Sequence, residues 1–598
     1  MQKKTLFLLL TAALSSLCFA TNSASACSTI VVGKNASATG NILLGHNEDN
    51  DGRIITSQYW VPAADHQAGE MIEYEPDAAK IPQVPHTYGF YWTQTLHPAG
   101  YSYSDGFVNE NGVAVASNQS YDTYDKDEAV HDGGVGYGIR RIVAERAKNA
   151  RDGVNIAIEL VKKYGYRAAG RVYTIADKDE AWQLNLIRGG RYIAKKVGDN
   201  EVVYVSNAYT LGPVDVKASD VLASDDLIQH AIDTGKYQPK KAGDFSDFNF
   251  REAYQTEARR DAEWIKSRSQ TAWKILTGKE IQSSKDFPYS ITPEKKLTVA
   301  DVKKVLRGHY AYEKRGEFGH QSINDIGNLG TFDSTIYELT PDKHFTIGWR
   351  TSGIPSENPY VPFYPLAKPS VAQSFMSPEE ATRQQFHAKP ESFSYKPGYG
   401  LFVYLTNQTL TDYIGGRDKL SKEIGELEAE WDKDRKAVEA RAKLIQRLDG
   451  NPKTLDYLHE FNAAAYDEAT QMIAKQRQEL HPADVLFLEG TLKNEGSQEA
   501  KVVVFGNKKF NAMKIDPKSI LVTSGLPTED IERIANPATA KSVVHEDVNK
   551  DGYPDAVITF DAKFATQLTG PGSSEEIYVF GKANGKKFGG FDVVKIEK

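Results

Sequence analysis

The chain has 598 residues, and 80 acidic against 72 basic side chains give it a formal net charge of −8. Because acidic and basic residues are mixed along its length without a basic patch, we predict no nucleic-acid partner. At roughly 100 to 200 residues per domain, this length predicts several domains, or one large domain with appendages.

Residues 1–26 have the layout of a secretory signal peptide. Two lysines precede an apolar run at 6–20, and a polar segment ends in Ala24-Ser25-Ala26, a small-x-small cleavage site. The run is shorter than the roughly 20 apolar residues that a membrane span needs, and no later stretch comes closer. We expect an exported protein, periplasmic or extracellular, with no membrane span. Losing the two lysines would change its formal charge from −8 to −10.

Cleavage after Ala26 would make Cys27 the first residue of the mature chain. Cys18 would leave with the signal peptide, so Cys27 would have no disulfide partner. A thiol with a pKa of about 8.5 beside an α-amine with a pKa of about 8 forms a nucleophile and its base without any cofactor.

Two other interpretations of Cys27 remain open. In a lipoprotein, acylation would block both the thiol and the amine, but Ala24 is a poor match to the large aliphatic residue usual three places before such a cysteine. The second alternative is a buried apolar cysteine that merely follows a cleavage site.

Residues 27–412 are predicted to form a mixed α and β domain. Short alternating or β-branched runs between Gly, Asn or Asp predict strands at 28–32, 41–44, 112–117, 171–176, 181–187, 201–205, 334–339 and 344–350. Apolar residues at helical spacing predict helices at 139–148, 154–164, 251–277 and 302–307. Strands early and late with helices between them predict sheets covered by helices.

The last third of the chain changes character twice. At 413–480, apolar residues at helical spacing lie among dense charges, and Asn451-Pro452 interrupts them. This pattern predicts a helical hairpin, which could mediate a homo-oligomer. Residues 481–598 have short strand-like runs between Gly, Asn and Pro turns, which predict a small β-sandwich domain.

Several segments in chain order point to one family. Residues 27–37 read CSTIVVGKNAS, and GHNED (45–49), NENGVA (109–114), VSN (205–207) and PYVP (359–362) follow. Together they resemble the dipeptidase A and secernin family of cysteine peptidases, which are N-terminal nucleophile hydrolases, over about residues 27–400. The resemblance implies an α+β fold, the four-layer αββα sandwich, and hydrolysis of dipeptides or small peptides through a thioester on the N-terminal cysteine.

The resemblance also implies roles for five residues. Cys27 would be the nucleophile, with its α-amine as base and acid, and Asp49 would contact that amine and the thiol; the alternative for Asp49 is a turn residue. Asn118 and Asn207 follow apolar strands, where they could donate to the oxyanion or simply form turns. The family often has Arg where this chain has His46, which weakens the case for substrate binding there and could make activity depend on pH.

Two further functions stay open. A non-peptide amidase of the same superfamily, acting on bile salts, penicillin V or acyl-homoserine lactones, would use the same cysteine. A non-catalytic, calcium-dependent surface-binding protein would instead depend on the helical hairpin and the C-terminal domain.

Oxygen-bearing side chains alternate near the end of the chain, as in a calcium-binding loop. Asp547, Asn549, Asp551 and Asp555 occupy the first, third, fifth and ninth positions of the loop, with Tyr553 at the seventh. A glycine at the sixth position allows the tight turn. The twelfth position is Ile rather than the bidentate Glu of an EF-hand, so we predict a structural calcium site; the alternative is a solvated turn.

Overall fold

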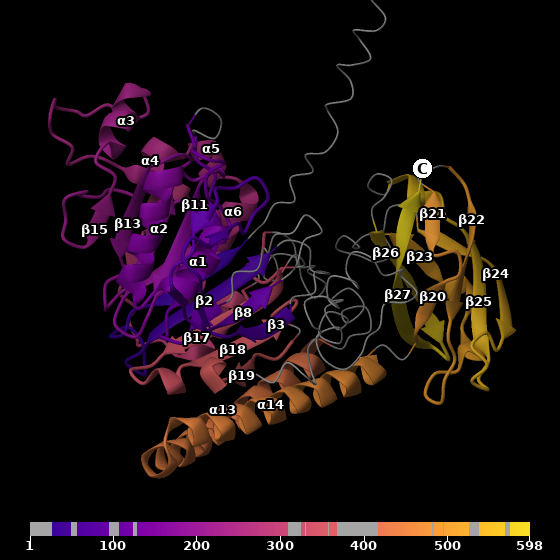
Figure 1. The fold of residues 1–598 in the computed structure, drawn as a ribbon. Helices are drawn as coiled ribbons and strands as arrows, with labels where there is room; N and C mark the ends of the chain where they lie inside the picture. Colours follow the sequence, from indigo (N-terminus) through magenta and orange to yellow (C-terminus); the bar gives the residue numbers. More distant parts are fainter. Residues whose placement is uncertain are drawn as a thin grey trace, which may run out of the picture.

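The computed structural model describes residues 27–49, 57–94, 107–123, 128–308, 324–328, 331–356, 358–367, 417–480, 483–493, 496–524, 537–567 and 574–597. The predicted signal peptide lies outside these ranges, so its cleavage stays a prediction. Within them, no helix is both long enough and apolar enough to span a membrane. Helices and strands alternate along the chain, which confirms the predicted mixed α and β class (Figure 1).

The first sheet contains the strand that Cys27 precedes. Its strands are antiparallel and lie in the order β16-β14-β1-β2-β17-β18-β19. β1 and β2 are buried along their whole length, as expected of strands covered on both faces. The strands are β1 (Ser28–Val32), β2 (Ile42–Asp49), β14 (Val202–Val205), β16 (Ser290–Ile291), β17 (Thr331–Leu339), β18 (Ile347–Ser352) and β19 (Val361–Phe363).

The second sheet is also antiparallel, in the order β15-β13-β12-β11-β10-β9-β8-β3. Its strands are β3 (Ser57–Val61), β8 (Phe90–Gln94), β9 (Phe107–Asn109), β10 (Ala114–Gln119), β11 (Arg171–Ala176), β12 (Ala181–Leu186), β13 (Tyr192–Lys196) and β15 (Val221–Ala223). Two small hairpins lie between β3 and β8 in the chain: β4 (Ala64–Asp65) with β7 (His86–Thr87), and β5 (Met71–Ile72) with β6 (Ile81–Pro82).

The two sheets face each other, and helices contact their outer faces. Thr29 of β1 bonds to Asn118 of β10 across the interface. The helices α1 (Gly138–Arg146) and α2 (Ala150–Tyr164) contact the second sheet, whereas α6 (Glu263–Thr277) and α7 (Val299–Leu306) contact the first. A Cβ at Gly45 would lie 2.8 Å from Cγ1 of Val302, so this glycine lets α7 pack closely on β2.

The predicted single helix at 251–277 is wrong, because the structure divides it. Three helices occupy the segment: α4 (Phe250–Tyr254), α5 (Glu257–Arg260) and α6, while α3 (Leu227–Asp233) precedes them. Thr256 and Ala262 have ψ angles of 151° and 128°, which interrupt the helical backbone. The Thr256 side chain accepts a hydrogen bond from the Arg259 N–H and so begins a new helix.

Residues 417–480 form two long helices, α13 (Arg417–Asp449) and α14 (Asn451–Leu480), which contact each other (Figure 1). Trp431, Tyr466 and Ala469 join the hydrophobic core between the sheets. Asn462 of α14 accepts the N–H of Tyr364 at 2.7 Å and donates to its carbonyl at 3.1 Å. The apolar side of this helix pair therefore packs on the first domain.

The last part of the chain has a sheet and a core of its own. Its strands lie in the order β20-β22-β25-β24-β23-β26-β27-β21 around a cluster that includes Phe487, Ile558 and Val579. The strands are β20 (Val485–Phe487), β21 (Thr491–Lys493), β22 (Glu499–Val504), β23 (Leu521–Ser524), β24 (Ala538–Glu546), β25 (Asp555–Asp561), β26 (Ser574–Ala583) and β27 (Lys586–Glu597).

Candidate active site

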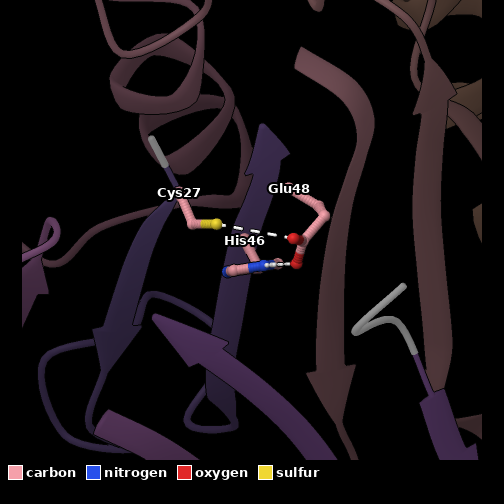
Figure 2. A group of neighbouring side chains, drawn as sticks. All are labelled: Cys27, His46 and Glu48. Atoms are coloured by element: carbon pink, nitrogen blue, oxygen red, sulfur yellow. Dashed lines mark hydrogen bonds and ion pairs between the residues drawn. The ribbon is translucent and has the colours of Figure 1, made fainter. Parts of the chain in front are cut away.

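Cys27 lies at the head of β1, fully buried, and its thiol faces a carboxylate. The thiol Sγ donates to Oε1 of Glu48 at 3.5 Å. Figure 2 shows that His46 and Glu48 project from the neighbouring strand toward the sulfur. β1 and β2 pair in a register that places Thr29 opposite His46, so the antiparallel pairing brings residues 27 and 48 together.

Side-chain alternation along β2 sorts its polar residues onto two faces. His46 and Glu48 line a small pocket between the two sheets, together with Ala116 of β10 and Thr335 of β17. Asn47 points the other way and donates to the carbonyls of Leu306 and Ile326, both at 2.9 Å. The pocket therefore lies between the sheets and beside the thiol.

A chain of hydrogen bonds fixes the tautomer of His46. Asn118 Nδ2 donates to the Val205 carbonyl at 3.4 Å, so its Oδ1 accepts the Thr29 hydroxyl at 2.5 Å. Thr29 has only one hydroxyl proton, and His46 Nδ1 at 2.8 Å must therefore donate to it. Nε2 of a neutral His46 is then unprotonated and faces Oε2 of Glu48 at 3.2 Å.

Burial decides the charge of both groups. The pKa of His46 falls to about 3, mainly because burial disfavours its charged form, and Arg140 and Arg171 act in the same direction. Burial raises the pKa of Glu48 to about 8 against the opposing effect of the same two arginines. A proton on Glu48 can thus bridge to Nε2 of His46. Of these two groups, Glu48 and not His46 is therefore expected to titrate near neutrality.

Asp49 lies on the opposite face of β2 from Glu48. Its carboxylate accepts hydrogen bonds from the Thr331 hydroxyl at 2.5 Å and from Asn328 Nδ2 at 2.8 Å. Burial raises the pKa of Asp49 to about 7, although Arg268 and the two hydrogen bonds oppose the change. The expected contacts of Asp49 with the α-amine and the thiol of a terminal Cys27 stay predictions.

Arg268 of α6 connects Cys27 to Asn207. Its Nη1 donates to the Cys27 carbonyl at 2.9 Å and its Nη2 to Oδ1 of Asn207 at 2.8 Å. Asn207 Nδ2 donates to the Gln119 carbonyl at 2.9 Å, and an amide nitrogen carries a second hydrogen that an oxyanion could accept. Four of the predicted residues, Cys27, His46, Asn118 and Asn207, therefore belong to one connected group.

Sequence reasoning missed Glu48 and Arg268. Glu48 could have been found, because it is two residues after His46 on a strand and so shares its face. No sequence pattern indicated that Arg268 belongs to the site, because this residue is on a helix 241 residues from Cys27 in the chain.

Replacing Glu48 with glutamine should change how stability depends on pH. Glu48 keeps its proton in the folded state up to about pH 8 but loses it near pH 4.5 when unfolded, so folding stability falls as pH rises through this window. Because glutamine does not titrate, the substitution should reduce the slope of unfolding free energy against pH by up to about 1.4 kcal/mol per pH unit. Urea unfolding from pH 5 to 8 measures this, with Glu426→Gln at an exposed glutamate as the control. If the unfolding free energies of Glu48→Gln and of the unchanged protein changed in parallel with pH, the prediction would be wrong.

The predicted calcium loop is the turn between β24 and β25. Asp547 accepts the backbone N–H groups of Asp551 at 3.1 Å and of Gly552 at 3.0 Å, and Asn549 Oδ1 accepts that of Asp551 at 3.1 Å. Asp551 in turn accepts the Tyr553 N–H at 2.9 Å. Gly552 has a φ of +88°, which suits glycine. These bonds orient the side-chain oxygens, each of which keeps a second lone pair for a cation.

Asp555, at the ninth position of the loop, is fully buried at the start of β25. Its two carboxylate oxygens accept the N–H groups of Gly506 and Val548, both at 2.8 Å. Asp555 therefore joins the turn to a neighbouring loop, whether or not it also binds a cation.

Comparison with known proteins assigns the chain to a family. Residues 26–388 match the family described as Peptidase family C69. A probable dipeptidase of Latilactobacillus sakei is 24% identical over 477 residues, covering 76% of this chain and 96% of its own length. Probable dipeptidase B of Streptococcus pyogenes serotype M3 is 24% identical over 447 residues, covering 68% and 86%.

Among solved structures, a mutant conjugated bile acid hydrolase from Clostridium perfringens aligns with 56% of this chain and 90% of its own. The sequence identity is 12% and the TM-score is 0.28. Because the family match covers more than half of the sequence, the protein belongs to peptidase family C69 and is a cysteine-type peptidase, as its resemblance to the cysteine dipeptidases predicted.

Proposed function

We propose that the protein is an exported dipeptidase that uses the N-terminal cysteine of its mature chain. The observation that carries this proposal is the buried thiol of Cys27, which follows a predicted cleavage site and contacts Glu48 at 3.5 Å. The two facing sheets with helices outside them support the N-terminal nucleophile hydrolase sandwich. The curated relatives are named probable dipeptidases, which supports dipeptides or small peptides as substrates.

The proposed reaction needs no cofactor. The α-amine of Cys27 accepts the thiol proton, and the thiolate attacks the peptide carbonyl to give a tetrahedral oxyanion. The second hydrogens of the Asn118 and Asn207 amides are the proposed donors to that oxyanion. The ammonium then protonates the leaving amine, which departs and leaves a thioester. Water attacks the thioester, and its proton passes through the amine back to the sulfur as the carboxylic acid leaves.

Two measurements test the proposal. Mass spectrometry of the exported protein should find Cys27 as an unmodified first residue, and a dipeptide panel should show hydrolysis that thiol alkylation abolishes. Bile salts, penicillin V and acyl-homoserine lactones belong on the same panel, because preferential hydrolysis of one of them would identify a non-peptide amidase instead. A first residue other than Cys27, or an acylated one in a protein that still cleaves dipeptides, would refute the mechanism.

We also propose that the turn at 547–555 binds a structural calcium ion. Calcium should stabilise the protein by about 1 to 3 kcal/mol when its concentration exceeds the dissociation constant by 10- to 100-fold. Asp547→Ala should remove this effect, because it removes the first ligand of the loop. Glu546→Ala, at the exposed neighbouring residue, should keep it. Thermal unfolding with calcium or with a chelator measures the difference. Equal shifts in the two variants would assign the calcium effect to another site.

Whether the protein assembles into a homo-oligomer stays a prediction that sedimentation can test. Most of the buried apolar residues of α13 and α14 already pack on the first domain, whereas Leu444 and Leu448 of α13 are exposed. An interface on this helix pair would therefore use its outer side, where these two leucines lie among charged residues.

A further inference from the structure

Three different metal-ligating groups meet at the head of β1, from Cys27, His46 and Glu48. Their sulfur, nitrogen and oxygen atoms all lie within 4.8 Å of one another, and no second group of this kind occurs among His, Cys, Asp and Glu in the part of the chain that the structure describes. The thiolate, imidazole and carboxylate of this trio are the ligand types that zinc binds in proteins. Figure 2 shows the three side chains converging on a common space.

The spacing of the three groups suits a tetrahedral ion. Zinc bonds of about 2.0 to 2.3 Å require neighbouring ligands to lie about 3.3 to 3.7 Å apart. Glu48 Oε1 lies 3.5 Å from the Cys27 sulfur, and Glu48 Oε2 lies 3.2 Å from His46 Nε2. The sulfur–oxygen separation thus matches before any side chain moves, whereas the nitrogen–oxygen separation, which runs to the other oxygen of the carboxylate, falls just below this range.

The surrounding hydrogen bonds hold neutral His46 in the tautomer with its proton on Nδ1, so that Nε2 can bind a metal. Thr29 accepts the Nδ1 proton because its own proton goes to Asn118. In neutral His46, Nε2 is therefore the acceptor nitrogen, and it faces the carboxylate of Glu48. Two lone pairs at 3.2 Å repel unless a cation or a proton lies between them. A second hydrogen bond that fixes the ring in this way is typical of metal-binding histidines.

We propose that Cys27, His46 and Glu48 bind a zinc ion, which occupies the nucleophile and reversibly inhibits the peptidase. Binding releases the thiol proton and the proton held between Glu48 and His46, and the fourth position remains for water. The inhibition rests on the proposed function, whereas the metal site depends only on the three side chains.

Cobalt(II) is the probe, because its thiolate complexes absorb in the near ultraviolet. The purified protein should show this band, and zinc should displace it. Cys27→Ser should abolish the band, and His46→Gln and Glu48→Gln should each weaken cobalt binding at least tenfold. His86→Gln removes an exposed histidine that pairs with Asp65, and it should change nothing. His46→Arg introduces the residue that the family often has here, and it provides a second variant if His46→Gln does not fold.

The outcomes separate the site from the function. A band that depends on all three residues supports the site, even if no dipeptide is cleaved, in which case only the proposed function fails. Dipeptide hydrolysis that zinc inhibits over the range in which it displaces cobalt supports both. Absence of the band, or a band that persists unchanged in His46→Arg, His46→Gln and Glu48→Gln, would overturn the inference.

Discussion

Cys27→Ala is expected to lower dipeptide hydrolysis by about 10³-fold or more, because it removes the nucleophile while leaving the rest of the site in place. Cys27→Ser should retain slow turnover, since a hydroxyl occupies the same position but gives up its proton much less readily than a thiol. Steady-state hydrolysis of a dipeptide with the purified variants measures both effects.

The fold of these variants must be compared first, because Cys27 is fully buried. Losing one sulfur atom should cost about 1 kcal/mol, so both variants should unfold cooperatively near the temperature of the unchanged protein. Mass spectrometry should also show that each variant begins at residue 27. Full activity in a folded Cys27→Ala protein would exclude this residue as the nucleophile.

Glu428→Gln is expected to destabilise the protein by about 3 to 5 kcal/mol, because it leaves the buried Lys303 and the partly buried Arg307 without their anion. Glu428 projects from α13 and accepts hydrogen bonds from Lys303 at 3.0 Å, Arg307 at 2.6 Å and the Tyr360 N–H at 2.7 Å. Burial alone would raise the pKa of Glu428, but Arg307 and Lys303 lower it to about 2. This cluster attaches the long helix to the first domain.

The sign of the pH effect follows from that pKa. Glu428 is ionised in the folded state down to about pH 2 but is protonated below about pH 4.5 when unfolded, so its stabilising effect is lost as pH falls through this window. Urea unfolding at pH 7 and pH 3.5 should show a smaller difference between Glu428→Gln and the unchanged protein at the lower pH. Glu426→Gln, on the exposed side of the same helix, should change stability by less than about 0.5 kcal/mol. Equal effects of the two substitutions would show that the cluster does not hold the helix.

Local sequence patterns predicted much of the first domain. The strands at 171–176 and 28–32 have the predicted bounds, because a β-branched run between turn residues is a local signal for a strand. The prediction of one helix at 251–277 was wrong. Thr256 can either continue a helix or begin one, and in the structure it begins a new helix. β2 extends to Asp49 rather than ending at residue 44, since β17 pairs with its polar end.

The candidate site, like the fold, was predicted only in part from the sequence. The sequence by itself determined the family, the candidate nucleophile and the polar residues around it, because a cleavage site next to a cysteine and an ordered set of family segments are local signals. Only the tertiary structure placed Glu48 against the thiol, turned Asp49 to the opposite face and brought Arg268 to the Cys27 carbonyl. These contacts depend on strand register and helix packing, which join residues far apart in the chain. Burial, which raises the pKa of Glu48 and lowers that of His46, is likewise a property of the folded protein.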